Sequence, residues 1–199
     1  MKKLALIILS HYFYSTGLLC QPIVKIYGND TADSLHTVMQ VNHCLQLLQV
    51  DEKICICVRI SEMMPEGVKG ITLPLNTEAK NKVGQALPVY QIRIDAGLSN
   101  KQRSVALVHE MIHLKQYVRG ELRNTKNNGF LWKGEVYKYL VASDRFTSPW
   151  EQEAYGLDNQ LADMVQKDTR PYPLVQQLKK VRSDQAGPYH VEKNKNTNY

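Results

Sequence analysis

Two histidines flank a glutamate in the segment "VALVHEMIHLKQY", residues 105–117. On an α-helix His109 and His113 lie one turn apart on the same face, so both imidazoles can reach a single ion. Zinc binds such nitrogens at about 2.0–2.1 Å. Glu110 lies about 100° around the helix from His109. We therefore expect it to take a proton from a metal-activated water rather than to bind the metal. The pattern predicts a hydrolytic Zn2+ site with Glu110 as the general base.

A catalytic zinc site needs a third protein ligand, with its fourth position left to water. The segment "PWEQEAYG", residues 149–156, offers Glu151 and Glu153 at the start of a predicted helix. Helical phase does not decide between them, because both flank an apolar stripe. A purely structural role is also open for Glu151, since Ser148-Pro149-Trp150-Glu151 has the form of a capping box. Three other histidines are poorer candidates: His36, His43 and His190.

The two segments together resemble the gluzincin metallopeptidases, whose active helix carries His-Glu-x-x-His and whose third ligand is a glutamate on a later helix. The resemblance covers roughly residues 85–168 and implies a small zincin-like domain that cleaves peptide or protein substrates. It favours Glu151 as the ligand, because Ala154 supplies the small residue found three positions later in many such families. Glu153 with Gly156 fits less well. Tyr155 holds the place where these families often carry an aspartate, so the partner of the histidines is undefined.

Residues around the two segments suggest further roles. Gln116 lies three positions after His113 on nearly the same face, where it can hydrogen-bond a ligand or serve as an ordinary polar helix residue. Trp132, Tyr137 and Tyr139 lie between the segments and are expected to wall the cleft or pack in the core, with a tyrosine hydroxyl as an alternative oxyanion donor.

Two other functions compete with hydrolysis. In the first, an exported protein uses zinc only to hold its helices together, with a fourth protein group such as Glu153 closing the coordination. In the second, a secreted binding module carries the motif without any metal. A coordination position open to water would distinguish a hydrolase from the structural zinc protein. Metal analysis would distinguish both zinc proteins from the metal-free binding module.

Periodicity predicts an α+β fold: a mixed sheet of about three to four strands, a helix behind it, the active-site helix and a helical C-terminal part. Strands are expected at 22–28, 53–60, 64–75 (short and at the edge of the sheet) and 87–95, and helices at 30–50, after Ser99, at 135–143 and at 148–168. Ser99 and Gln102 form a capping box, and Gly120 marks the helix end. Residues 121–134 read as a loop.

The N-terminus "MKKLALIILSHYFYSTGLLC" has the charged start and short apolar run of a secretory leader. We expect residues 1–20 to be a signal peptide and the protein to be exported, with lipidation of Cys20 and membrane anchoring as the alternative. The domain is expected at 21–181, followed by a disordered polar tail at 182–199. Cys44 could pair with Cys55 or Cys57 after export, or all three could be buried thiols. Cys55 and Cys57 are not expected to pair with each other.

The chain has 199 residues and a formal net charge of +6. Its basic residues form no run interleaved with aromatics, so nucleic-acid binding is not expected.

Overall fold

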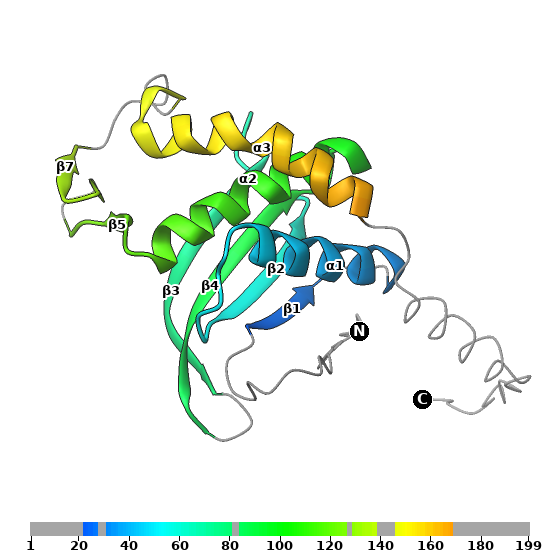
Figure 1. Cartoon of the computed structure of the whole chain (residues 1–199), viewed down its shortest axis with the longest axis horizontal. Helices are drawn as coiled ribbons and strands as arrows, with labels where there is room; N and C mark the ends of the chain where they lie inside the picture. Colours follow the sequence, from blue (N-terminus) through cyan, green and yellow to red (C-terminus); the bar gives the residue numbers. More distant parts are fainter. Residues whose placement is uncertain (1–21, 28–30, 81–83, 127–128, 139–145, 169–199) are drawn as a thin grey trace, which may run out of the picture. The chain divides into compact units, whose positions relative to one another are not determined.

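The computed structural model describes residues 22–27, 31–80, 84–126, 129–138 and 146–168 (Figure 1). Several predictions concern residues outside these ranges and therefore stay predictions. They are the leader at 1–20 with Cys20, the tail at 182–199 with His190, and the role of Tyr139. No helix within the described ranges combines the length and apolar composition needed to cross a membrane.

The described chain has the α+β fold expected from the sequence, built on a mixed four-stranded sheet. Its strands are β1 (Ile23–Tyr27), β2 (Cys55–Ser61), β3 (Gly70–Lys80) and β4 (Ala86–Asp95), arranged in the order β1-β2-β4-β3. β1, β2 and β4 run parallel, and β3 runs antiparallel to β4.

Three helices pack above one face of this sheet: α1 (Thr31–Leu47), α2 (Asn100–Val118) and α3 (Pro149–Asp168). α1 and α2 lie against the strands, and α3 packs on both helices (Figure 1). The face that they cover carries Ile56 and Val58 of β2 and Ile92 and Ile94 of β4, each at most 1% exposed. The alternation of a strand places these even-numbered side chains on one face, and they form the main core with Val108, Met111 and Ile112 of α2.

Local signals define both ends of α2. The Ser99 side chain accepts a hydrogen bond from the Gln102 backbone, and the Gln102 side chain accepts one from the Ser99 backbone, which completes the expected capping box. At the other end, Gly120 adopts a φ of 68° that favours glycine, and its N–H donates to Tyr117 O at 3.0 Å. These signals fix where α2 begins and ends, and therefore where its histidines fall.

The prediction of a short strand at 64–75 was wrong in length but right in placing it at an edge. β3 extends to Lys80, into the stretch after 75 that the sequence left unassigned. Its pairing with β4 continues past an irregularity between Leu75 and Glu78. A β-bulge lets a polar segment stay in the ladder although its alternation is broken.

The predictions of a loop at 121–134 and a helix at 135–143 were also wrong where the structure describes them. These residues form a three-stranded antiparallel sheet of β5 (Leu122–Asn124), β6 (Phe130–Trp132) and β7 (Glu135–Tyr137). Lys133 and Gly134, with φ of 47° and 93°, make the tight turn between β6 and β7. Such two-residue turns favour glycine and produce a hairpin. The second half of the chain is thus not wholly helical.

The small sheet is held by aromatic packing. Leu122, Trp132 and Trp150 are buried together, with Tyr117, Phe130 and Tyr137 against them. Because Trp150 lies in the first turn of α3 and Tyr117 in the last turn of α2, this cluster joins the hairpin to both helices that carry the candidate site.

Candidate metal centre

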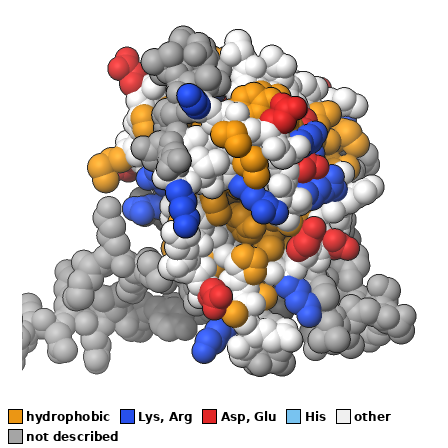
Figure 2. Space-filling view, turned by 90° about the vertical axis from the view of Figure 1, so that its left-hand side faces the viewer, with side chains coloured by type: hydrophobic (Ala, Val, Ile, Leu, Met, Phe, Trp, Pro, Cys, Tyr) orange, Lys and Arg blue, Asp and Glu red, His pale blue; other side chains and the backbone are white. Residues whose placement is uncertain are grey.

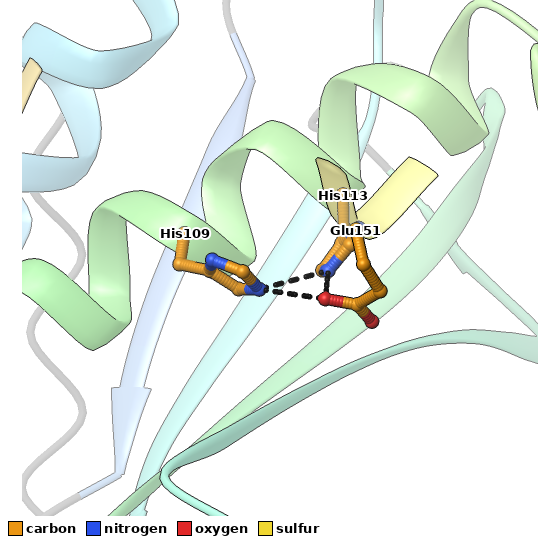
Figure 3. Close-up of side chains that lie close together, drawn as sticks. All are labelled: His109, His113 and Glu151. Carbon is orange, nitrogen blue, oxygen red and sulfur yellow. Dashed lines mark hydrogen bonds and ion pairs between the residues drawn. The ribbon is translucent and has the colours of Figure 1, made fainter. Parts of the chain in front are cut away.

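The structure brings His109 and His113 of α2 together with Glu151 of α3 (Figure 3). His109 Nε2 lies 3.1 Å from Glu151 Oε2 and 3.1 Å from His113 Nε2, and His113 Nε2 lies 3.4 Å from the same oxygen. The side chains of the two histidines are 12% and 9% exposed, and that of Glu151 is 20% exposed. This His-His-Glu group could hold a metal ion.

The spacing of the three donor atoms fits a tetrahedral ion. Ligand bonds of about 2.0–2.1 Å in tetrahedral geometry place neighbouring donor atoms roughly 3.3–3.4 Å apart. The observed 3.1–3.4 Å separations approach those of three corners of such a tetrahedron. The donor set of two imidazoles and one carboxylate also matches known catalytic zinc sites.

Asp158, a residue that the sequence reasoning missed, orients His109. Its Oδ2 lies 3.3 Å from His109 Nδ1, and its side chain is only 6% exposed. A carboxylate accepts a hydrogen bond from Nδ1–H, so the lone pair of Nε2 is directed to the centre. The position follows Glu151 by seven residues, two helical turns along α3. Tyr155 stands where gluzincin families often carry an aspartate. Its ring packs against the His109 ring, with 4.6 Å between the ring centroids.

Gln116 orients His113 in the way that Asp158 orients His109. Gln116 is fully buried, and its Nε2 donates to Trp150 O at 3.0 Å, which leaves Oε1 as the acceptor for His113 Nδ1 at 2.8 Å. With their ring protons on Nδ1, both histidines would offer the lone pairs of Nε2 next to the Glu151 oxygen. Three such acceptors repel one another at these distances, so a shared cation, either a metal ion or a proton, would relieve the repulsion.

The electrostatics of the group show its affinity for positive charge. Burial acts to lower the pKa of His113, but the hydrogen bond to Glu151 and the charges of Glu110 and Glu151 raise it to about 9. Burial acts to raise the pKa of Glu151, but its hydrogen bonds to His109 and His113 lower it to about 2. Both shifts favour a positive charge within the group.

Glu110 lies beside the His-His-Glu group and is held in place by hydrogen bonds from strand β3 of the sheet. Thr72 Oγ1 of β3 lies 2.8 Å from Glu110 Oε2 and 2.9 Å from Glu110 O, and the residue is 4% exposed. Burial raises the pKa of Glu110, while both histidines and Thr72 act in the other direction. Gly70 of β3 is required here, because a Cβ at that position would lie 2.6 Å from Glu110 Cγ.

Glu153, the alternative ligand, points to a different partner. Its Oε1 contacts Lys115 Nζ, and its Oε2 lies 3.4 Å from Lys133 Nζ. Lys115 is only 8% exposed, so Glu153 neutralises a buried ammonium. Helical phase alone left the two glutamates equal, and the packing of α3 on α2 separates them.

The remaining candidates lie elsewhere. Trp132 and Tyr137 pack around Trp150, with ring centroids 6.3 and 5.5 Å away, so they belong to the aromatic cluster. His36 is exposed and His43 half-buried on α1, and neither joins the metal-ligand group found among the described residues.

Comparisons with protein-family models, with curated proteins and with solved structures found no match for this chain.

Proposed function

We propose that this protein is an exported zinc-dependent peptidase in which His109, His113 and Glu151 hold Zn2+ and Glu110 is the general base. The observation that carries the proposal is the 3.1–3.4 Å triangle of Nε2, Nε2 and Oε2 atoms next to a buried carboxylate. Export rests on the leader pattern at residues 1–20 alone.

When bound, Zn2+ supplies the Lewis acidity that activates water and polarises a peptide carbonyl. Glu110 accepts the proton of the attacking water and returns it to the departing amine. Its raised pKa suits this role, because a base must hold a proton between the two steps. Asp158 and Gln116, which lie next to the Nδ1 atoms of His109 and His113, would hold both imidazoles with Nε2 toward the metal.

The edge strand β3 is the element best suited to align a substrate. Within the described residues β3 pairs only with β4, whereas β4 is enclosed between β2 and β3. An extended peptide can therefore pair with the edge of β3 that is free among the described residues, but not with β4. Gly70 and Thr72 bring this edge next to Glu110. The side of the molecule toward β3 and β5–β7 in Figure 1 also exposes hydrophobic side chains flanked by charged ones, which suits an extended peptide (Figure 2).

A non-catalytic zinc protein is the second candidate. It requires a fourth protein ligand, and among the described residues the group contains three members. Three protein ligands leave a position for water, which favours hydrolysis over a closed structural site.

The experiment measures zinc content and cleavage of a peptide library by the wild type and by Glu110→Gln. We expect about one zinc per chain in both proteins and a loss of cleavage of about 10²–10⁴-fold in the variant. Glu62→Gln, an exposed glutamate outside the site, is the matched control and should cleave at the wild-type rate. Undiminished cleavage by Glu110→Gln would remove the base assignment, and absence of zinc in the wild type would remove both zinc functions.

A further inference from the structure

A pair of cysteines lies on the sheet face opposite to the helices. Cys55 and Cys57 are two residues apart in β2, so both point away from the face that carries Ile56 and Val58. Cys55 is 1% exposed and Cys57 is half-buried. In the neighbouring strand β1, Ile23 is in register with Cys55 and Lys25 with Cys57.

The two thiols interact with each other and with β1. Cys55 hydrogen-bonds Cys57, and the Tyr27 hydroxyl also hydrogen-bonds Cys57. The hydrogen bond from Cys55 lowers the pKa of Cys57, burial opposes it, and the Lys25 ammonium lowers it further. The pKa of Cys55 is raised in turn, first by its hydrogen bond to Cys57 and then by burial. The hydrogen bond therefore favours the thiolate form of Cys57 over that of Cys55.

The strand geometry disfavours a disulfide between these residues. Two residues along a strand span about 6.6 Å, and their side chains leave the sheet in parallel. A disulfide needs a Cβ–Cβ separation of about 3.5–4.5 Å. Cys44, Cys55 and Cys57 are accordingly all free in the structure. A metal ion between two thiolates spans a wider gap than one S–S bond, because a metal–thiolate bond alone is about as long as an S–S bond (about 2.3 Å for zinc).

We propose that Cys55 and Cys57 form a second metal site, which takes a soft monovalent ion, Cu(I), between two thiolates. Thiolates select Cu(I) over the harder ions. Two thiolates with Cu(I) carry a net charge of −1, and the ammonium of Lys25 compensates it. Binding forms two Cu–S bonds and releases to solvent the protons that the pair holds, without any change of oxidation state. The site is independent of the His-His-Glu group.

The test is anaerobic titration of the reduced, zinc-loaded full chain with Cu(I) against a chromophoric Cu(I) chelator. All proteins carry Cys20→Ser, so that the fourth cysteine does not contribute. We expect one tightly held equivalent of Cu(I) and its loss in Cys57→Ser and Cys55→Ala. Cys44→Ser is the matched control, because Cys44 is a buried thiol on α1 and burial raises its pKa to about 12.

A second measurement does not depend on the folding of any variant. X-ray absorption at the copper edge of the wild-type complex should give two sulfur neighbours and no imidazole. Copper held by nitrogen ligands, stoichiometric binding that survives Cys57→Ser, or absence of a tight equivalent in the wild type would each overturn the proposal. Because zinc is measured separately, none of these results bears on the peptidase proposal.

Discussion

Asp158 Oδ2 lies 3.3 Å from Nδ1 of His109, across the contact between α3 and α2. One helix thus contributes both a candidate ligand, Glu151, and the residue that orients another ligand. Removing a carboxylate that supports a metal-bound histidine lowers metal affinity by about 10–100-fold. We expect that loss of zinc affinity in Asp158→Ala, measured by competition with a chromophoric chelator. Asp163→Ala, at an exposed position of the same helix, should keep wild-type affinity. Equal affinities in the two variants would contradict the role of Asp158.

Substitutions of Glu151 and of Glu153 should have different effects on the zinc content of the protein. Glu151→Ala removes one of three ligands, and we expect it to lose stoichiometric zinc after gel filtration, as His113→Ala should. Glu153→Ala should retain one zinc per chain, because Glu153 contacts Lys115 and Lys133 instead. Metal analysis of the purified proteins decides the matter. Zinc lost from Glu153→Ala, in a folded protein, would reverse the assignment.

Glu153 should matter for stability instead. Loss of a charge-assisted hydrogen bond to the buried Lys115 costs about 1.5–3 kcal/mol of unfolding free energy at neutral pH, so we expect a loss in this range for Glu153→Gln by urea denaturation. Burial acts to raise the pKa of Glu153, but its hydrogen bond and charge interaction with Lys115, together with Lys133, lower it. A carboxyl whose folded pKa is lowered stabilises the protein above its unfolded pKa of about 4.3, and that stability disappears as pH falls through the folded value. The difference between variant and wild type should therefore shrink in acid. If the difference in unfolding free energy is the same at neutral pH and in acid, the ion pair is not its cause.

Zinc should stabilise the fold, because its candidate ligands tie α2 to α3. A ligand that binds only the folded state at 100 times its Kd contributes about 2.7 kcal/mol. We expect the Tm of the wild type to rise with added zinc and to fall with a chelator. In His113→Ala the Tm should be insensitive to both additions. A zinc-dependent shift that persists in this variant would place the metal elsewhere.

Gly156 offers a test of α3 that is separate from the site. It lies inside the helix, and a Cβ built there meets nothing within 4 Å. Replacing glycine by alanine in an open helix position stabilises by about 0.5–1 kcal/mol. We expect this gain in Gly156→Ala by denaturation, with zinc affinity unchanged. Destabilisation by the substitution would contradict the position of this residue in the helix.

Much of the fold was predictable because it depends on neighbours in sequence. The capping box at Ser99 and the stop at Gly120 are local signals, and both fixed α2 correctly. The parallel strands were found from short apolar runs. The hairpin of β6 and β7 was missed although its signal was present: the turn at Lys133 and Gly134 separates two short runs that contain aromatic residues. Each of its strands has three residues, which is too short for an alternation of apolar and polar residues to be recognised. Side chains of both strands pack against Trp150, which is distant in the sequence.

The sharing of one helix face by His109 and His113 follows from their spacing, because four residues make about one helical turn whatever surrounds the helix. Which carboxylate meets them depends on contacts between helices that are distant in the sequence. Glu151 and Glu153 stand two positions apart on α3, and the packing of α3 on α2 turns one toward the imidazoles and the other toward Lys115. The same packing brings in Asp158, 49 residues after His109. Such contacts depend on how two helices are placed against each other, and no local pattern along the chain encodes that placement.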